Sequence, residues 1–509
     1  MSATVVEDQP PVVAEGPPPP PPPVLKPMGL PHFGDDETIP DFLEGLAKYL
    51  KKSKSMGKHV GYYTEMGFEW LLVNDAELGT SLLQQNTGHA LWPGLIAASS
   101  AFFGPKVLFV LEGEEWMKLR RIMRGELLET QVHNFGYDMG GVAQQMMQRL
   151  QTMIGKEVDA YTLVTAYHLD AASKALYGDA HVGCVNSFPE RSDLVQSYIW
   201  FTNELPRRAF AFMEPTLNVD YETDNEDNRI MKKMSGMAHN VILNILKKRL
   251  ATRDADLKKG GKPDMLELFF QAYDKEYGAN ATAEQIEHEL GANLVELLFA
   301  GFNTVSGTMT NAIFRLSQEP EVVAKIRAEV DPLLAGKDRP LNFDDFEKMK
   351  YTQLVFQEAL RIYGPSPVMA RMMGPGDTQL DDLTIPAGTQ AMIPLAALAI
   401  DPRYWKDPLK MWPERPEWHD DKGNFLRMSR TRGAFMPFSD GPRNCVGQHF
   451  AKVEFCMLIG TLFTKFDFSP AHGYEHGASF NGFGFHPCDK NTQERVVRMV
   501  VHPRKGSKL

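Results

Sequence analysis

The chain has 509 residues, 43% of them hydrophobic, and a formal net charge of -11 at pH 7. This length and composition can form a large buried core, while the acidic balance argues against general binding of nucleic acid, which requires a basic surface. The four cysteines are too few and too widely spaced for a disulfide framework, which suits a reducing compartment: Cys184, Cys445, Cys456 and Cys488. No run reaches the roughly 18 consecutive apolar residues of a transmembrane helix, so we expect no transmembrane anchor.

The N-terminal segment is acidic and contains an unbroken proline run from Pro17 to Pro23. Such a run adopts an extended polyproline conformation and cannot join a core. The segment has neither the arginines of a transit peptide nor the apolar block of a signal peptide. We expect a disordered leader over residues 1–30, one folded domain over residues 31–502 and a polar tail over residues 503–509. The alternative to a disordered leader is that the proline run docks on a partner protein with a proline-binding groove.

Hydrophobic periodicity and turn residues predict a mainly α chain with a smaller β region. Two strands read as a hairpin, 61–64 and 68–73, and Asn74 is expected to cap a helix from about Asp75 to Gln84. The segment 86–109 is rich in aromatic and aliphatic residues but has no clear period. The remaining predicted elements are helices over 161–177, 193–212, 229–251 and 450–463, a hairpin over 382–394 and a strand over 494–502.

A basic and aromatic pair lies early in the chain. Trp116 and Arg120 are four residues apart, so on a helix they share one face and place an indole N–H beside a guanidinium. Together they can clamp an anion. Lys118, Arg121 and Arg124 add positive charge on other faces of this helix, either as a solvated surface or as a docking site for an acidic electron donor.

The longest predicted helix opens at a capping box, 282–285, and runs to about Ser317. Its apolar middle is interrupted by Gly301 and by the polar pair Asn303 and Thr304. A glycine and polar residues are locally unfavourable inside an apolar helix. Such violations of local preference tend to mark functional sites.

Further on, Glu358 and Arg361 are three residues apart on a predicted helix and therefore face the same way. Arg415, in the sequence Pro413-Glu414-Arg415, follows about fifty residues later. A carboxylate with two guanidinium groups is stable in a core only when all three are mutually satisfied.

The segment from Phe438 to Gly447 holds one cysteine, Cys445, in a turn that contains glycines just before a predicted helix. Glycine lets the backbone turn tightly and approach a flat ligand. The amides of the turn and of the helix start favour a thiolate at Cys445, and Arg443 can hold a carboxylate bidentately. A soft anionic sulfur beside a carboxylate clamp suits an iron porphyrin.

The spacing F-x-x-G-x-R-x-C-x-G, from Phe438 to Gly447, resembles the haem-binding signature of the cytochrome P-450 family, the haem-thiolate monooxygenases. The resemblance implies the P-450 fold in a single catalytic domain and haem b, iron protoporphyrin IX, as cofactor. It implies that Cys445 is the iron ligand and that Phe438 and Arg443 belong to the cofactor loop. By the same resemblance Trp116, Arg120 and Arg371 bind the haem propionates, and Glu358, Arg361 and Arg415 form a buried cluster that locks the cysteine loop.

In the family, the long central helix carries [A/G]-G-x-[D/E]-T. Gly301 would make room for dioxygen and Thr304 would steer protons onto it. Asn303 departs from this pattern, because an amide stands where the family has an acid, and an amide cannot carry a proton away from water. A buried asparagine satisfied by a neighbouring carbonyl is the structural alternative for this residue.

By resemblance, the reaction inserts one oxygen atom from dioxygen into a substrate, with electrons from a separate reductase, either an NADPH-dependent flavoprotein or a ferredoxin. Aromatic residues in the segment 86–109, which forms a pocket wall in the family, suggest a lipophilic small-molecule substrate; core packing is the other role for that segment. One alternative is a haem-thiolate isomerase or dehydratase of a lipid hydroperoxide, and another is a non-catalytic haem-binding protein. Ser507-Lys508-Leu509 has the form of a peroxisomal address, so the expected location is cytoplasmic or peroxisomal.

Overall fold

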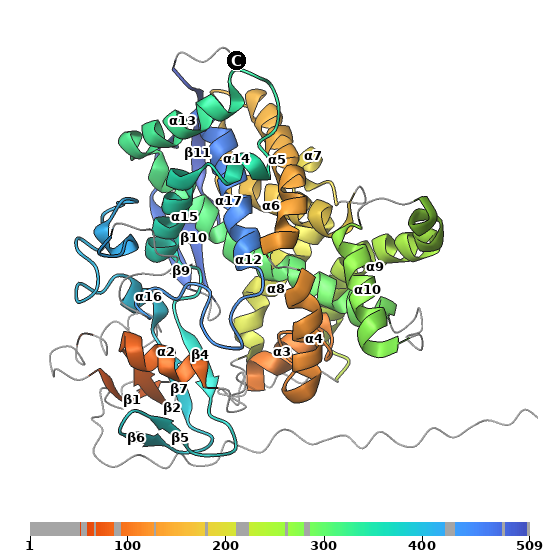
Figure 1. Cartoon of the computed structure of the whole chain (residues 1–509), viewed down its shortest axis with the longest axis vertical. Helices are drawn as coiled ribbons and strands as arrows, with labels where there is room; N and C mark the ends of the chain where they lie inside the picture. Colours follow the sequence, from red (N-terminus) through yellow and green to blue (C-terminus); the bar gives the residue numbers. More distant parts are fainter. Residues whose placement is uncertain are drawn as a thin grey trace, which may run out of the picture.

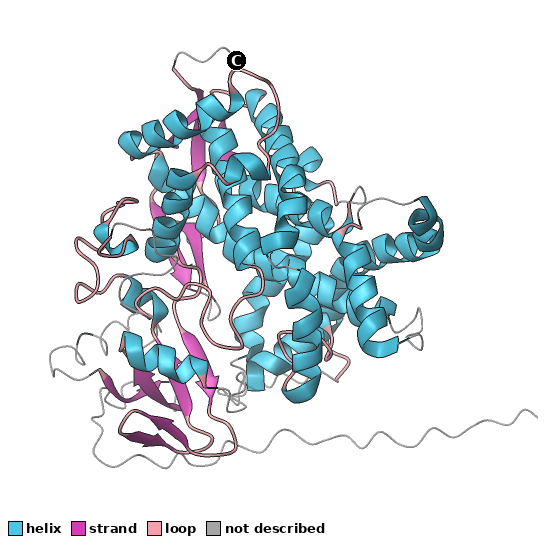
Figure 2. Cartoon of the chain, in the orientation of Figure 1, coloured by secondary structure: helices cyan, strands magenta, loops and turns pink. Residues whose placement is uncertain are grey.

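The computed structural model describes residue 51 and residues 59–65, 68–85, 93–126, 129–178, 182–209, 223–259, 263–278, 286–422, 433–480 and 484–505. Helices make up most of it, and the strands gather along one side (Figure 2). The predicted leader, the capping box at residues 282–285 and the tripeptide 507–509 lie outside the described residues.

The helices confirm the predicted pattern of a mainly α chain. Residues 93–103, inside the segment without clear period, also form a helix. The helical elements are α2 (Ala76–Gln84), α3 (Pro93–Phe103), α4 (Gly113–Glu126), α5 (Glu129–Gln151), α6 (Ala160–Tyr177), α7 (Cys184–Ser187), α8 (Asp193–Ala209), α9 (Glu226–Lys259), α10 (Met265–Tyr277), the π-turn η4 (Ile286–Leu290), α12 (Gly291–Leu316), α13 (Pro320–Leu334), α14 (Phe343–Phe346), α15 (Lys350–Tyr363), α16 (Leu395–Ala399), the 3-10 turn η5 (Pro416–Trp418) and α17 (Gln448–Lys465).

Helix α12 runs through the middle of the molecule (Figure 1). It packs against α6, α9, α15 and α17, and α17 packs in turn against α5. Most residues of α17 are buried, from Phe450 to Thr464 with the exception of Lys452. The prediction of an amphipathic helix here was therefore wrong, because helices surround α17 instead of covering one face.

The strands form four small sheets. The largest has the order β1-β2-β7-β4, and the others pair β3-β11-β8, β9 with β10, and β5 with β6. The bounds are β1 (Val60–Glu65), β2 (Phe68–Val73), β3 (Glu157–Asp159), β4 (Met369–Met372), β5 (Thr378–Leu380), β6 (Leu383–Ile385), β7 (Gln390–Ile393), β8 (Phe466–Pro470), β9 (His476–Phe480), β10 (Phe485–Asp489) and β11 (Arg498–Pro503). The predicted hairpin over 61–73 is confirmed as the antiparallel pair β1 and β2.

Two local predictions were wrong. The segment 382–394 is not a hairpin, because β6 pairs back with β5 while β7 pairs with β4 and, in parallel, with β2. The cap of α2 is Asp75, whose side chain accepts hydrogen bonds from the N–H groups of Glu77 and Leu78, each at 3.0 Å. The backbone N–H of Asn74 instead continues the strand pairing, with His59.

The buried apolar residues form one large cluster among the helices and a smaller one around the sheet that contains β1 and β2. Among the described helices, none has both the length and the apolar character that crossing a membrane requires. The loop before α17 lies between the two clusters, since Phe435 belongs to the first and Met436 to the second. The fold thus brings the end of this loop up to α12.

Candidate active site

A cavity of about 360 Å³ lies between α12 and the loop that precedes α17. Its walls come from α4, α6, α12, α15, α17, β4, residues 108–109 and the loop 437–447, and most of its lining is apolar. The polar residues that line it are Trp116, Arg120, His168, Glu296, Thr304, Thr308, Ser366, Arg371, Ser439, Arg443, Asn444 and Cys445. All the predicted site residues lie at this cavity except Asn303, which is not among the residues that line it.

The loop that carries Cys445 is held by its own backbone. The N–H of Cys445 donates to the carbonyl of Phe438 at 2.9 Å, and α17 begins directly after Gly447. Gly441 has φ of +72°, and a Cβ on it would come 2.0 Å from the carbonyl oxygen of Leu83 in α2. The turn and the close approach of α2 therefore both require this glycine. They explain it without the expected approach of a flat ligand.

Cys445 is the one cysteine of the chain that is exposed, and it opens onto the cavity. Burial in the surrounding protein raises the pKa of its thiol, while the N–H of Gly447 and the guanidinium of Arg120 act more weakly in the opposite direction. The N–H of Gly447 thus favours the thiolate, as predicted for the amides of this turn, but the loss of solvation at Cys445 outweighs it. A coordinated cation would supply the missing stabilisation, since metal binding deprotonates a thiol.

Two guanidinium groups in the cavity have no carboxylate partner in an ion pair among the described residues: Arg371 and Arg443. Arg371 on β4 is buried, and burial, together with the charge of Arg443, lowers its pKa to about 10. Arg443 lies over the ring of Trp116, 4.2 Å from its centroid, and donates to the carbonyl of Leu111 at 2.8 Å. Arg120 donates to Asn444 at 2.5 Å. The four predicted anion-binding residues are thus gathered around one cavity.

The predicted charged cluster is present and fully buried. Glu358 accepts hydrogen bonds from Arg361 at 2.8 and 3.0 Å and from Arg415 at 2.8 and 2.9 Å, and all three side chains are 0% exposed. The remaining N–H groups reach backbone carbonyls, including those of Ala399 and Lys410. Each charge is satisfied, which is the condition under which a buried triad is stable.

The wall of α12 at Gly301 is shaped by a histidine from α6. A Cβ on residue 301 would come 2.4 Å from Cε1 and 2.6 Å from Nε2 of His168. The other ring nitrogen of His168 lies 2.8 Å from Glu454 on α17, and both side chains are almost completely buried. The His168 ring therefore requires a glycine at residue 301. Gly301 also lines the cavity, and its role in making room for dioxygen stays a prediction.

Thr304 and Asn303 differ in where they point. Thr304 lines the cavity, and its hydroxyl donates to the carbonyl of Ala300 one turn earlier at 2.7 Å. Asn303 is 2% exposed, and its amide nitrogen lies near Gly484, at the start of β10. Its Oδ1 has no hydrogen-bond partner among the described residues. A neighbouring carbonyl could accept from the amide nitrogen of Asn303, but it could not satisfy this oxygen.

Sequence reasoning missed two functional candidates that line this cavity, His168 and Glu296, and also Glu454, which holds His168 from behind the wall. Glu296 is buried and lies on α12 eight residues before Thr304, so both residues face the cavity with Ala300 between them. That spacing from Thr304 is a signal that the sequence contains. His168 has no such signal, because its neighbours on α12 and α17 are far away in the chain.

The aromatic residues of the 86–109 segment divide between two roles. Leu108 and Phe109 line the cavity, whereas Phe102 is stacked on Phe201 of α8, with centroids 4.0 Å apart, inside a core cluster.

The basic residues predicted on other faces of α4 differ in their surroundings. Arg121 forms an ion pair with Glu276 at 3.0 Å, and Lys118 is exposed.

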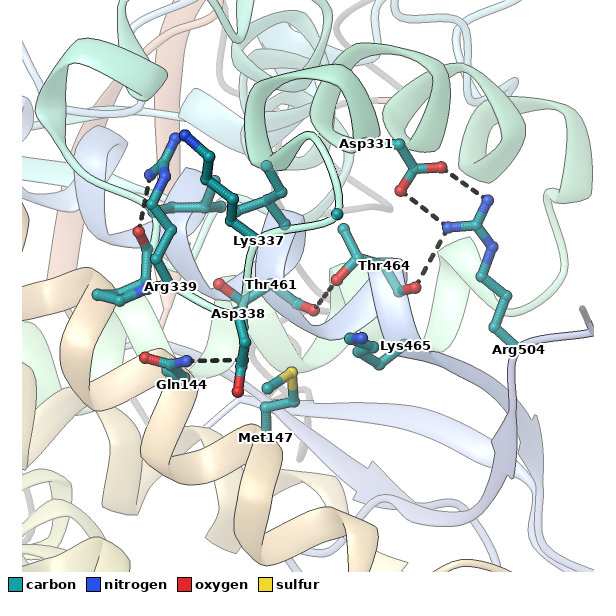
Figure 3. A pocket seen from close by; sticks show the side chains of 14 residues that line it. Gln144, Met147, Asp331, Lys337, Asp338, Arg339, Thr461, Thr464, Lys465 and Arg504 are labelled. Atoms are coloured by element: carbon teal, nitrogen blue, oxygen red, sulfur yellow. Dashed lines mark hydrogen bonds and ion pairs between the residues drawn. The ribbon is translucent and has the colours of Figure 1, made fainter. Parts of the chain in front are cut away.

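A second hollow, of about 300 Å³, lies among the end of α5, residues 336–341, the end of α17 and Arg504. Arg504 donates to Asp331 at 2.7 and 2.9 Å, and on the opposite side Gln144 donates to Asp338 at 3.1 Å (Figure 3). None of the predicted site residues lines this hollow. The contacts of Arg504 join the C-terminal segment to α13 and α17, and that of Gln144 joins α5 to residues 336–341.

Comparison with known proteins identifies the family and the fold. A family model described as cytochrome P450 matches residues 18–491. The chain is 24% identical over 463 residues to cytochrome P450 3A25 of Mus musculus, covering 87% of this chain and 85% of that protein. It is 26% identical over 388 residues to cytochrome P450 3A31 of Mesocricetus auratus, covering 72% of each. The solved structure titled "Crystal structure of cytochrome P450DA heme domain" matches with a TM-score of 0.76, at 19% identity, and covers 94% of this chain and 98% of that chain.

The chain belongs to the cytochrome P450 family. The predicted fold is confirmed by the structural match, which at this identity shows the fold alone. Members of the family are haem-binding monooxygenases, a class of oxidoreductase that uses dioxygen, a substrate and a redox partner, and this protein is an enzyme of the same class.

Proposed function

We propose that this protein holds haem b, iron protoporphyrin IX, through the thiolate of Cys445 and inserts one oxygen atom from dioxygen into a lipophilic substrate. One observation carries the proposal: Cys445 opens onto the same cavity that Gly301 and Thr304 of α12 line. The iron porphyrin supplies the centre at which dioxygen is bound and activated.

The residues of the cavity fit such a cofactor. Arg371 and Arg443 form no ion pair with a described carboxylate, although the charge of Glu112 acts on Arg443. Each loses solvation by burial, so anionic groups between them would stabilise both. The two propionates of a haem are such anions. Arg120 and the indole of Trp116 lie at the same end of the cavity and would complete their binding. Phe438 lines the cavity and fixes Cys445 through its backbone carbonyl.

The protein's own proton-handling groups lie on α12. We propose that the Thr304 hydroxyl, now donating to the Ala300 carbonyl, turns to hold water and protons at the dioxygen end of the cavity. Asn303 does not line the cavity, so we assign it a positioning role, through its packing between α12 and the segment at Gly484. The isomerase alternative requires Asn303 to contact the substrate, and its location behind the wall does not favour that function.

The electrons are proposed to come from a separate reductase, an NADPH-dependent flavoprotein or a ferredoxin. The exposed Lys118 on α4 lies two residues from Trp116 and offers a positive group near the cavity for an acidic donor. Charge reversal at Lys118 should slow electron transfer and weaken its dependence on salt.

One turnover comparison tests the proposed reaction. Purified protein is supplied with candidate lipophilic substrates, a reductase, NADPH and dioxygen in one reaction and with a fatty acid hydroperoxide alone in the other. Oxygenated product labelled from ¹⁸O₂ in the first reaction, with no product in the second, supports the monooxygenase. Rapid conversion of the hydroperoxide without electrons, and no labelled product in the first reaction, would establish the isomerase instead.

For the compartment, we propose the cytoplasm or the peroxisome, on the basis of residues 507–509, whose signal is read only at a free carboxyl terminus. A fluorescent protein fused upstream of the chain, with and without the tripeptide, tests this in a cell with peroxisomes. An unchanged diffuse distribution on deletion would reject the peroxisomal reading.

A further inference from the structure

Glu296 is a carboxyl group in the wall of an otherwise mostly apolar cavity. It lies on α12, is 5% exposed, and lines the cavity with Leu297, Ala300 and Thr304. Because Glu296, Ala300 and Thr304 are spaced four residues apart, they form one stripe along the helix. At 1.5 Å per residue, Glu296 is about 12 Å along the helix from Thr304. The carboxyl is therefore at the far end of the cavity from the proposed reaction centre.

The structural contact that Glu296 makes does not require its charge. Its Oε1 accepts a hydrogen bond from the backbone N–H of Phe109 at 2.8 Å. The adjacent N–H, of Leu108, is accepted by the amide oxygen of Asn293 at 2.9 Å. The uncharged amide of Asn293, one turn earlier on α12, thus holds the same loop at Leu108. A glutamine would suffice at residue 296 if tethering this loop were its whole role.

The charge of Glu296 also lacks a counter-ion within the described part of the protein. No described cation forms an ion pair with it, and the causes of its pKa shift are burial and backbone hydrogen bonds. Burial raises the pKa of this carboxyl to about 8, and the N–H groups of Phe109 and Leu108 only partly oppose that shift. A buried ionisable group without a partner is costly unless a ligand supplies one.

We propose that Glu296 is a specificity-determining residue that selects substrates with a cationic head group, such as an ammonium, on an apolar body. The cation pairs with the carboxylate while the apolar body lies along α12 toward Thr304. This inference rests on the proposed function in one respect, the assignment of the end of the substrate that is oxidised. The preference for binding a cation does not depend on turnover. It narrows the substrate class from lipophilic molecules to lipophilic cations.

Binding to the ferric holoprotein tests the proposal without any electron donor. The probes are trimethyl(4-phenylbutyl)ammonium and its neutral isostere, in which a tert-butyl group replaces the trimethylammonium group. A quaternary nitrogen has no lone pair, so it cannot bind iron and mimic the expected preference. Dissociation constants are measured by calorimetry for wild type, Glu296→Gln and Glu289→Gln. Glu289 is the matched control, because it lies two turns earlier, pairs with Lys106 and does not line the cavity.

The wild type and Glu289→Gln should bind the cation at least about tenfold more tightly than the isostere, as expected for a buried charge pair. Glu296→Gln should lose this preference and leave the affinity for the isostere unchanged. The proposal is overturned by a wild type that does not prefer the cation, by a preference that survives in Glu296→Gln, or by an equal loss for both probes in that variant. A protein that binds the cation but makes no oxygenated product would refute the proposed function and leave this inference standing.

Discussion

The imidazole of His168 on α6 lies so close to Gly301 on α12 that a methyl group at residue 301 would fall 2.4 Å from its Cε1 atom. The ring cannot move away freely, because its Nδ1 is held by Glu454 of α17 at 2.8 Å. Through these two contacts His168 links α6 to α12 and to α17, three of the helices that line the cavity.

Gly301→Ala should destabilise the haem-loaded protein by about 1–3 kcal/mol, because the new methyl must displace a tethered ring in a packed wall. His168→Ala should reduce this penalty when the two changes are combined. Gly236→Ala in α9 is the control: nothing lies within 4 Å of the added methyl, and replacing a helical glycine should stabilise the protein slightly. Denaturant unfolding measures all four variants. Equal stability of Gly301→Ala and wild type would contradict this account of the wall.

Glu358→Ala should lower the yield of folded protein and its haem content, because it leaves Arg361 and Arg415 charged and unpaired in the core. Removing one member of a buried cluster costs about 3–5 kcal/mol. Glu319→Ala is the matched change at the surface, where Glu319 and Arg315 are each 29% exposed, and it should cost at most about 1 kcal/mol. Soluble Glu358→Ala protein with full haem and selectively lost activity would show that the cluster is catalytic.

The pH dependence of stability should carry the signature of Glu296. Its pKa in the folded protein is raised from 4.5 to about 8, so between these values the folded state holds a proton that the unfolded state has released. The free energy of unfolding should therefore fall as pH rises across this window, by up to about 1.4 kcal/mol per unit from this group. Glu296→Gln should remove that slope. Parallel stability curves for wild type and variant would show that Glu296 is not buried as described.

Thr304→Ala should release hydrogen peroxide at the expense of product, because the cavity loses the hydroxyl proposed to hold protons beside dioxygen. Asn303→Asp should keep its coupling, since residue 303 lies behind the cavity wall. The ratio of product to peroxide per NADPH measures both. Tight coupling in Thr304→Ala together with an inactive Asn303→Asp would favour the isomerase.

The sequence predicted those parts of the site that local chemistry specifies. The loop around Cys445 and the pair Trp116 and Arg120 are recognisable because the interacting residues are close in the chain. The partners of Glu358 could be named only through the family resemblance, since Arg415 is far away in sequence. The fold class followed from helical periods that packing did not override.

The remaining errors have a common physical cause in long-range pairing. Strand β7 leaves its neighbour β6 because β2 and β4 offer it partners on both sides. His168 and Glu454 meet only after α6 and α17 have packed against α12. Glu296 becomes a buried acid only when the loop at Phe109 closes over it. None of these contacts has a local sequence signal strong enough to predict it.

The absorption spectrum of the reduced protein with carbon monoxide tests the central claim most directly. Thiolate ligation by Cys445 predicts the strongly red-shifted Soret band that distinguishes haem-thiolate proteins, and Cys445→Ala should abolish it. Cys456→Ala and Cys488→Ala should retain it, because both thiols are buried and neither lines the cavity. A band of the histidine-ligated type in freshly purified, folded wild-type protein would contradict the account.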